Sequence, residues 1–560
     1  MKKAILFLIA VLCVTLSLTA QRTATYFQKT YKSNKDSTSL TFQSVAATKD
    51  GGYALMGNYQ NATNFGDMMM IKTDSLGAVT FSSILASDTI ESATGIRQTP
   101  DGGYIMCGWN SSPVDFSKGD MLLAKLDSTG KLKWSTRFGG ADVDEAGDVA
   151  VLNSGDIVVA GRSPETVGGS FSAYFLLTRS TGVPEDGQFV RFGDAPSTFS
   201  SIDKTFDGGS IACGYTGSFF QRTGFDPMMV KFNNQGVIQW GKRYATPGTQ
   251  FSSMVRQTLD SGYIIIGQQA VTQPNGSIPQ TFYVIKTKAN GDTLFCKAFD
   301  TGKFEFAKGI SDVSNGYIIS GYATVGIDTV RYKSPATGND TFATRDRSNA
   351  FAMKIDYAGA IKWGKLYGDS TKISRLYAST PTQDGGATLV GETFGFGNTF
   401  GAGFVIHIDR EGNIGAGTGC QIRNLNFTSA PFTIKDSSNV VFINSGEENA
   451  SNLRTGSITV IKSDICSGTG ASYADVKDNR LPDNAVKLYP NPTHAQLTVE
   501  IEASNNASTV QIYDVMGRLM HNEVTKQDAL TIDVSNFTHG LYFLKVEQGG
   551  KYATKKFIVE

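Results

Sequence analysis

The octapeptide Asp101-Gly-Gly-Tyr-Ile-Met-Cys-Gly108 decides the fold, because copies of it recur along the chain. In each copy a polar turn precedes an apolar stretch that ends in glycine. The final glycines lie 51 to 55 residues apart, except for one interval of 70 residues. A fixed period of this length indicates a repeat architecture. The copies end at Gly57, Gly108, Gly161, Gly214, Gly267, Gly321, Gly391 and, in a weaker form, Gly446.

Each unit contains four stretches that are typical of strands. One short stretch precedes the polar turn, and the apolar stretch follows it. A third stretch ends in a tight turn such as Asp127-Ser-Thr-Gly130, where the aspartate bonds its own backbone and the glycine adopts positive φ. A fourth stretch, such as 133–138, carries its aromatics on one face. Four antiparallel strands in a unit of about 53 residues predict one blade of a β-propeller.

The two ends of the repeat region indicate how the ring closes. Residues 27–31 have the fourth-strand pattern but no strands of their own before them. The eighth unit ends near Ile465 and lacks a fourth strand, so the first segment is expected to complete the last unit. We therefore expect an all-β chain with an eight-bladed propeller. Seven blades with a degenerate unit, or an open β-solenoid, are the alternatives.

Composition and the first residues indicate where the protein goes. The chain has 51 basic and 51 acidic residues, which argues against a nucleic-acid binder that works through a basic field. Lys2, Lys3 and the apolar stretch 4–18 predict a secretory signal peptide over residues 1–20. An uncleaved anchor is the alternative, although its apolar run is short for a membrane span. No later run is long enough, so we expect no transmembrane segment after cleavage.

Loop lengths predict the working face of the ring. The connections from second to third strand and from fourth to first strand are long and differ between units, and the longest covers residues 322–349. Variable loops on a rigid scaffold are where binding usually occurs. Packing of these loops on one another is the alternative reading. The candidate ligand-binding residues are Trp109, Phe116, Phe219, Phe220, Phe225, Arg331, Tyr332, Phe394 and Phe396.

The sequence offers little material for catalysis. No HExxH or Gly-x-Ser-x-Gly motif is present, so we name no catalytic residue and no metal ligand. Residues 142–153 resemble a calcium loop but lack an oxygen ligand at Ala146 and a glutamate at Asn153. We therefore expect a linker there and no cofactor, and a calcium site is the alternative. Cys420 and Cys466 flank the eighth unit and are candidates for a disulfide in an exported chain.

The last 76 residues form a separate compact unit after a polar linker. Their alternating segments predict about seven short strands, which is typical of a sandwich. The segments start with Tyr-Pro-Asn-Pro at 489–492 and end with Lys-Lys-Phe-Ile-Val at 555–559. They closely resemble the type A C-terminal sorting domain of the Bacteroidota type IX secretion system. The matching motif residues are Tyr489, Pro490, Asn491, Pro492, Gly517, Arg518, Gly540, Tyr542, Lys555 and Lys556.

This resemblance implies export across the outer membrane to the cell surface or the medium, with the type IX secretion machinery as a partner. The repeats also resemble Asp-Gly-Gly-Tyr propeller modules of secreted Bacteroidota proteins, which share no single activity. We expect a signal peptide over 1–20, a propeller over 21–466, a linker over 467–484 and a sorting sandwich over 485–560.

The function predicted from these features is non-enzymatic binding or adhesion, with an extracellular glycan or protein as the partner. A glycan-active enzyme with carboxylates in its loops is one alternative, because two acidic side chains are enough for glycoside hydrolysis. A passive surface-coat protein is the other. Fold alone does not choose among the three, because propellers host many activities.

Overall fold

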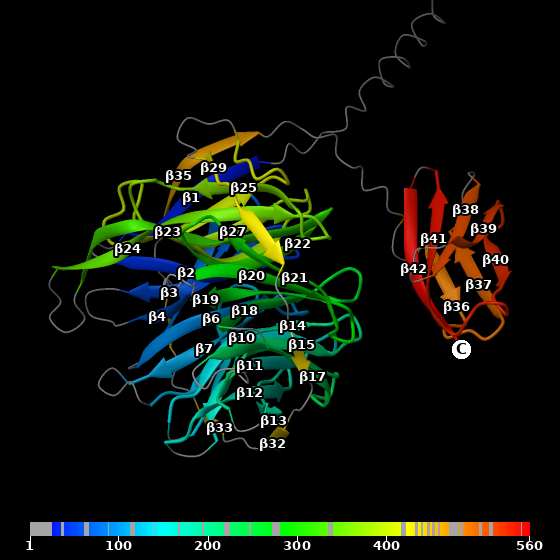
Figure 1. Cartoon of the computed structure of the whole chain (residues 1–560), viewed down its shortest axis with the longest axis horizontal. Helices are drawn as coiled ribbons and strands as arrows, with labels where there is room; N and C mark the ends of the chain where they lie inside the picture. The colour runs from blue at the N-terminus through cyan, green and yellow to red at the C-terminus, as the bar shows by residue number, and fades with distance from the viewer. Residues whose placement is uncertain are drawn as a thin grey trace, which may run out of the picture. The chain divides into compact units, whose positions relative to one another are not determined.

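The computed structural model shows an all-β chain in two compact units, one over Thr23–Gly470 and one that includes Ala471–Glu560. We call them the ring unit and the tail unit (Figure 1). The structure describes residues 25–560 except 35–37, 61–65, 88, 113–117, 141, 166–167, 193–194, 218–223, 246–247, 271–279, 334–339, 416–421, 432–434, 438–440, 445–447, 451–453, 457–459, 470–480, 482–484, 503–506, 515–518 and 550.

The ring unit is built from antiparallel sheets whose four main strands are consecutive in the chain, as the repeats predict. The first three sheets contain β2 (Ser39–Ala47), β3 (Tyr53–Gln60), β4 (Asp67–Thr73) and β5 (Val79–Ala86); β6 (Ile90–Gln98), β7 (Tyr104–Ser111), β8 (Met121–Leu126) and β9 (Leu132–Phe138); and β10 (Glu145–Val151), β11 (Ile157–Pro164), β12 (Phe171–Thr178) and β13 (Pro184–Arg191).

Three further sheets of the same kind follow. They contain β14 (Ser197–Lys204), β15 (Ser210–Gly217), β16 (Phe225–Phe232) and β17 (Ile238–Ala245); β18 (Thr249–Gln257), β19 (Tyr263–Ala270), β20 (Gln280–Thr287) and β21 (Thr293–Asp300); and β22 (Phe304–Val313), β23 (Gly316–Lys333), β24 (Asp340–Ile355) and β25 (Ile361–Tyr367). The expected long insertion therefore lengthens the hairpin of β23 and β24.

The N-terminal segment supplies the missing fourth strand of a seventh sheet. This sheet holds β26 (Ser374–Pro381), β27 (Ala387–Thr393), β28 (Ala402–Ile408) and β1 (Thr25–Ser33). Phe27 on β1 lies opposite His407 on β28. The prediction that residues 27–31 complete a unit begun at the other end of the repeats is confirmed, but the unit completed is the seventh.

The expected eighth unit is not a sheet of its own, which corrects the eight-unit prediction for the described residues. Residues 422–469 instead add one outer strand to each of the seven sheets, in reverse order along the chain. Most of these strands have only three or four residues, too few to build an independent sheet. They are β29 (Ile422–Asn424), β30 (Thr428–Pro431), β31 (Lys435–Ser437), β32 (Val441–Asn444), β33 (Glu448–Ala450), β34 (Arg454–Gly456) and β35 (Val460–Thr469).

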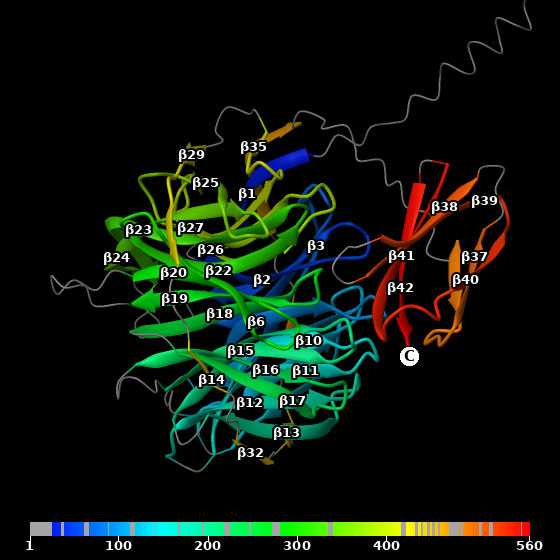
Figure 2. The ribbon, with the colours of Figure 1, turned by 45° about the vertical axis from the view of Figure 1, so that its right-hand side comes forward.

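We call residues 422–469 the outer segment. It joins β25, β21, β17, β13, β9, β5 and β1 in turn. Figures 1 and 2 show one of these pairings, with β32 beside β13 at the outer edge of the unit. The candidate disulfide stays a prediction, because Cys420 lies outside the described residues, whereas Cys466 lies on β35 opposite Gln28.

The core of the ring unit lies between adjacent sheets. Tyr53 and Leu55 on β3 pack into a cluster shared with Val390 and Val405 of the seventh sheet. The alternate residues Ala54 and Met56 pack into another cluster, shared with Met106 and Leu122 of the second sheet. A strand buried on both faces explains why the second and third stretches of each unit are continuously apolar.

The polar turns are held by recurring ion pairs. Lys72 on β4 contacts Asp50 at 2.8 Å, and Lys125, Lys231 and Lys286 make the same pair in their own sheets. Although partial burial opposes the effect, hydrogen bonds from Lys72 and Thr48 lower the pKa of Asp50 to about 2. His407 takes the lysine position opposite Asp384, at 3.5 Å. The aspartates that recur in the polar turns therefore serve to hold these turns.

The tail unit consists of seven described strands in two sheets. One sheet contains β36, β37 and β40, the other contains β39, β38, β41 and β42, and their inner faces share one apolar core that includes Leu497 and Leu544. The strands are β36 (Val486–Tyr489), β37 (Gln496–Ile501), β38 (Ser508–Asp514), β39 (Leu519–Thr525), β40 (Ala529–Asp533), β41 (Gly540–Gln548) and β42 (Lys551–Val559).

Two buried glutamates hold the connections that lead into β6 and β22. Glu91 accepts hydrogen bonds from the hydroxyls of Ser87 and Thr89, the latter at 2.7 Å. Glu305 accepts hydrogen bonds from the hydroxyl and the backbone N–H of Thr301. Burial raises the pKa of each glutamate to about 7. Both therefore ionise near neutral pH.

The raised pKa values predict that the ring unit loses stability as the pH rises. The folded state binds more protons than the unfolded state between the ordinary pKa of 4.5 and about 7. The stabilisation that each protonated glutamate gives to the folded state is complete below pH 4.5. As the pH rises through 7, the free energy of unfolding falls by about 3 kcal/mol per glutamate. We expect Glu91→Gln combined with Glu305→Gln to flatten this slope in urea unfolding between pH 5 and 8.

The matched control is Glu411→Gln, because the Glu411 side chain is half exposed. This control should keep the wild-type slope. An equally steep slope in the Glu91→Gln, Glu305→Gln variant would contradict the assignment of the pH dependence to the two buried glutamates.

Candidate ligand-binding site

The first strands of the seven sheets line the middle of the ring unit. Each first strand contacts the first strand of the next sheet, and β26 of the seventh sheet contacts β2 of the first. Figure 2 shows β2, β6, β18 and β22 near the centre of the unit. A cavity in the middle of the ring unit, around which the seven sheets are arranged, is therefore lined mainly by residues of the first strands.

Every first strand carries a bulge of one residue at the same place. The register against the second strand shifts between Phe42 and Ser44, for example, and between Ala307 and Gly309. A bulge re-aims side chains and is common beside functional sites. The bulged residues are Gln43, Thr94, Gly147, Ser200, Ser253, Lys308 and Tyr377.

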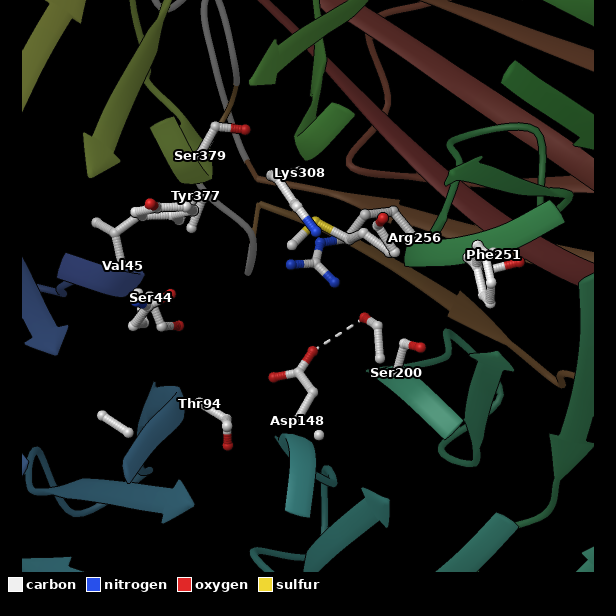
Figure 3. Close-up of a pocket in the computed structure, with 18 of the residues that line it drawn as sticks. Ser44, Val45, Thr94, Asp148, Ser200, Phe251, Arg256, Lys308, Tyr377 and Ser379 are labelled. Carbon is white, nitrogen blue, oxygen red and sulfur yellow. Dashed lines mark hydrogen bonds between the residues drawn. The ribbon is translucent and has the colours of Figure 1, made fainter. Parts of the chain in front are cut away.

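All seven bulged residues line one cavity of about 420 Å³, which we call the axial pocket (Figure 3). Its volume lies within the range of small-molecule sites. Neighbouring first-strand residues such as Ser44 and Arg256 complete the wall, and Tyr215 and Gln268 reach it from second strands. The lining is rich in hydroxyl groups and contains four charged side chains.

One of the charged side chains is an aspartate that is already paired. Asp148 accepts a hydrogen bond from Arg97 at 3.0 Å and another from the Ser201 hydroxyl at 3.0 Å. Although burial opposes the effect, the carboxylates of Asp148 and Asp203 hold the pKa of Arg97 above its usual range. Arg97 and Asp148 thus neutralise each other in the pocket wall.

The other two charged side chains are cations. Arg256 donates a hydrogen bond to the backbone oxygen of Val255 at 2.8 Å. Within the part of the chain that the structure describes, Arg256 and Lys308 have no ion pair with a carboxylate, and the Lys308 ammonium has no hydrogen bond. Burial lowers the pKa of Lys308. Figure 3 shows the nitrogen atoms of both side chains pointing into the pocket.

Aromatic rings form part of the wall. Tyr215 and Phe251 meet edge to face at 4.9 Å, and the predicted site residue Phe225 packs against both rings, at 5.2 and 5.3 Å. On the other side of the pocket the Tyr377 hydroxyl donates a hydrogen bond to Glu392 at 2.7 Å. The pocket therefore offers apolar faces as well as charge.

Metal chemistry has no support in the described residues. They contain no group of three or more His, Cys, Asp or Glu side chains placed to hold a metal ion. In the stretch that resembles a calcium loop, Asp142 accepts a hydrogen bond from the N–H of Gly168 and Asp144 accepts one from the N–H of Gly140. These carboxylates hold loops together. The expectation of no cofactor stays a prediction.

A second functional region lies in the tail unit, where the start and the end of the sorting motif meet. The Asn491 side chain accepts a hydrogen bond from the N–H of Ile558 at 2.9 Å and donates one to the backbone oxygen of Lys556 at 3.3 Å. Tyr542 is buried, and its hydroxyl donates to the Thr538 oxygen at 2.8 Å. Gly517 and Arg518 lie outside the described residues.

Residues 487–560 match the family described as the secretion system C-terminal sorting domain. The chain is a type IX secretion cargo. This cargo is exported across the outer membrane to the cell surface or the extracellular space. In the described part of the cargo no helix is long and apolar enough to span a membrane. No curated protein matches the chain.

Several solved structures resemble the cargo at low similarity. A protein of unknown function from Dyadobacter fermentans has a TM-score of 0.34 and 10% identity, and the match covers 69% of this chain and 99% of that one. A glucose dehydrogenase has a TM-score of 0.31, with 11% identity over 58% and 98%. Fructan 1-exohydrolase IIa from Cichorium intybus has a TM-score of 0.24, with 9% identity over 73% and 97%.

The structure places the predicted loop residues at several separate positions of the cargo. Trp109 lies near the end of β7, opposite Ser92 and Met121. Phe396 packs on the buried ring of Phe404 at 6.2 Å, as expected of a structural residue, and Phe394 lies in the same loop. Arg331 and Tyr332 lie on the extended part of β23. Phe116, Phe219 and Phe220 lie outside the described residues.

The loop residues as a ligand site stay a prediction, and only Phe225 is seen to contact the axial pocket through its neighbours. The sequence reasoning missed the pocket itself. Its one available signal was the non-repeating Lys308, which stands where the other six units carry Gln, Thr, Gly, Ser, Ser and Tyr.

Proposed function

We propose that this exported cargo is a non-enzymatic binding module whose ring unit holds a glycan or a partner protein. The axial pocket carries the proposal, since all seven sheets contribute a bulged residue to one polar cavity. The sorting domain accounts for export, so we assign binding outside the cell to the ring unit. A lining that combines many hydroxyl groups with aromatic residues suits sugars.

We also propose that the ring unit is a closed propeller of seven blades. Two observations support closure. Strand β1 lies at the start of the repeat region and pairs with β28 at the far end of it. Strand β2 of the first sheet contacts both β26 and β27 of the seventh sheet. In an open solenoid the first and last units would have no reason to share a sheet.

Purified full-length protein tests the binding function. We expect it to be retained on at least one polysaccharide in a panel of soluble and insoluble substrates, without release of reducing sugar. Chain retention is measured by sedimentation or affinity electrophoresis, and release by a reducing-end assay. Binding without turnover is expected because the described pocket has no unpaired carboxylate to act as a general acid or base.

Three other outcomes are informative. Release of sugar would contradict the non-enzymatic proposal and direct attention to the loop carboxylates. Retention by no polysaccharide, with capture of a specific surface protein, would leave the binding function standing with a protein partner. If the protein is neither retained on a polysaccharide nor able to capture a surface protein, the binding function is contradicted and a passive coat protein is favoured.

A further inference from the structure

The charged side chains that line the axial pocket do not balance. Three cations and one carboxylate line it, and the Arg97–Asp148 pair cancels two of these charges. Lys308 and Arg256 remain on one side, and among the described residues neither forms an ion pair with a carboxylate. Both side chains are half-buried. Cations withdrawn from water are normally paired, because an uncompensated charge is costly to desolvate.

The repeat does not explain these cations. The lysines that hold the polar turns recur in several sheets and each has its aspartate. Lys308 occupies a bulge position at which no other sheet has a charged residue. Its side chain also points into the pocket rather than toward a turn (Figure 3). A position that breaks the repeat and faces a cavity is better explained by a ligand.

The rest of the lining indicates what the ligand carries besides negative charge. The Ser200 hydroxyl has no hydrogen-bond partner among the described residues, whereas both N–H groups of the Gln268 amide already bond Ser253 and the Ala307 oxygen. A hydroxyl without a partner is suited to bind a ligand hydroxyl. Tyr215 and Phe251 also line the pocket, and their rings meet edge to face at 4.9 Å. A sugar ring offers both hydroxyls and an apolar face.

We propose that the axial pocket binds an acidic sugar of the uronate class, whose carboxylate is held between Lys308 and Arg256. The guanidinium of Arg256 donates two parallel hydrogen bonds to the carboxylate, and the Lys308 ammonium supplies a point charge. The sugar hydroxyls face Ser200. This inference rests on the proposed binding function and narrows its ligand to one chemical class.

The two cations lie on one side of the pocket, and Asp148 lies across from them (Figure 3). Arg97 already pairs with both carboxylate oxygens of Asp148, so that pair carries no net charge. We therefore expect the ligand carboxylate to meet the two cations and the neutral part of the sugar to lie toward Asp148.

Calorimetric titration of the full chain tests the proposal with galacturonate and glucuronate as probes, and with galactose and glucose as their neutral counterparts. We expect the uronates alone to bind, with an affinity that falls as salt is added. Lys308→Met and Arg256→Met should each raise the dissociation constant about 10- to 100-fold, as expected for loss of a charge-assisted hydrogen bond. Lys308→Arg should retain most of the affinity.

The control is Lys303→Met on the exposed connection that leads into the same strand, β22, and it should bind like the wild type. Thermal unfolding by circular dichroism checks that each variant is folded. Equal binding of neutral sugars, or wild-type affinity in a folded Lys308→Met variant, overturns the charge assignment. Absence of uronate binding by a protein that is still retained on polysaccharide or captures a partner overturns this inference alone. If retention and capture also fail, the proposed function falls with it.

Discussion

Deleting residues 487–560 should stop the protein from reaching the cell surface and leave it in the periplasm. These residues are the matched sorting domain, and the deletion removes most of the tail unit. We expect more than about a tenfold loss of surface and extracellular protein, because the deletion removes the domain that the secretion machinery recognises. Immunoblots of surface, medium and periplasmic fractions measure the effect.

The control for this deletion is the exposed lysine variant Lys526→Met, which leaves the matched strands in place. It should be exported normally. Asn491→Ala is the sharper variant, because it removes the two hydrogen bonds that tie the start of the motif to the last strand. Normal surface levels of the deletion variant would contradict the sorting assignment.

Replacing Phe27 by alanine should destabilise the ring unit by about 3–5 kcal/mol, the usual cost of removing a fully buried phenylalanine. Phe27 is fully buried on β1, where its ring meets His407 edge to face at 5.5 Å and lies under the Lys29 ammonium at 4.4 Å. The loss falls on the one strand that joins the start of the repeats to their end. Urea unfolding followed by tryptophan fluorescence measures it.

Lys32→Ala is the matched control on the same strand, because Lys32 is exposed. It should change the free energy of unfolding by less than about 0.5 kcal/mol. If Phe27→Ala destabilises no more than this control, β1 is not needed for closure and the seven-bladed proposal loses its main support.

The repeating part of the fold could be predicted from the sequence because it depends on local signals. Turns such as Asp127–Gly130 fix where strands end, and the apolar stretch before Gly108 is continuous because its strand is buried on both faces. The orphan segment 27–31 was also informative, since a strand pattern without neighbours must pair elsewhere. These predictions needed no knowledge of distant contacts.

The outer segment and the pocket could not be predicted, because both depend on pairing between distant residues. The stretch 441–444 has the apolar pattern of a second strand, yet it pairs with β13 more than two hundred residues away. The bulge that turns Lys308 into the pocket is a register shift between two strands, and it leaves no mark in the alternation of polar and apolar residues. Loop aromatics were the visible alternative, and among those that the structure describes only Phe225 packs against residues of the pocket.

The outer segment has a consequence for solubility. A sheet that ended at its fourth strand would present a row of unpaired backbone groups, to which a second chain could add. Six of the seven sheets instead end in a strand of only three or four residues. So short an edge gives a neighbouring molecule little to pair with. These short edges are expected to make the exported protein resist edge-to-edge aggregation. The residues that form them are the ones that the repeat pattern presents as an incomplete eighth unit.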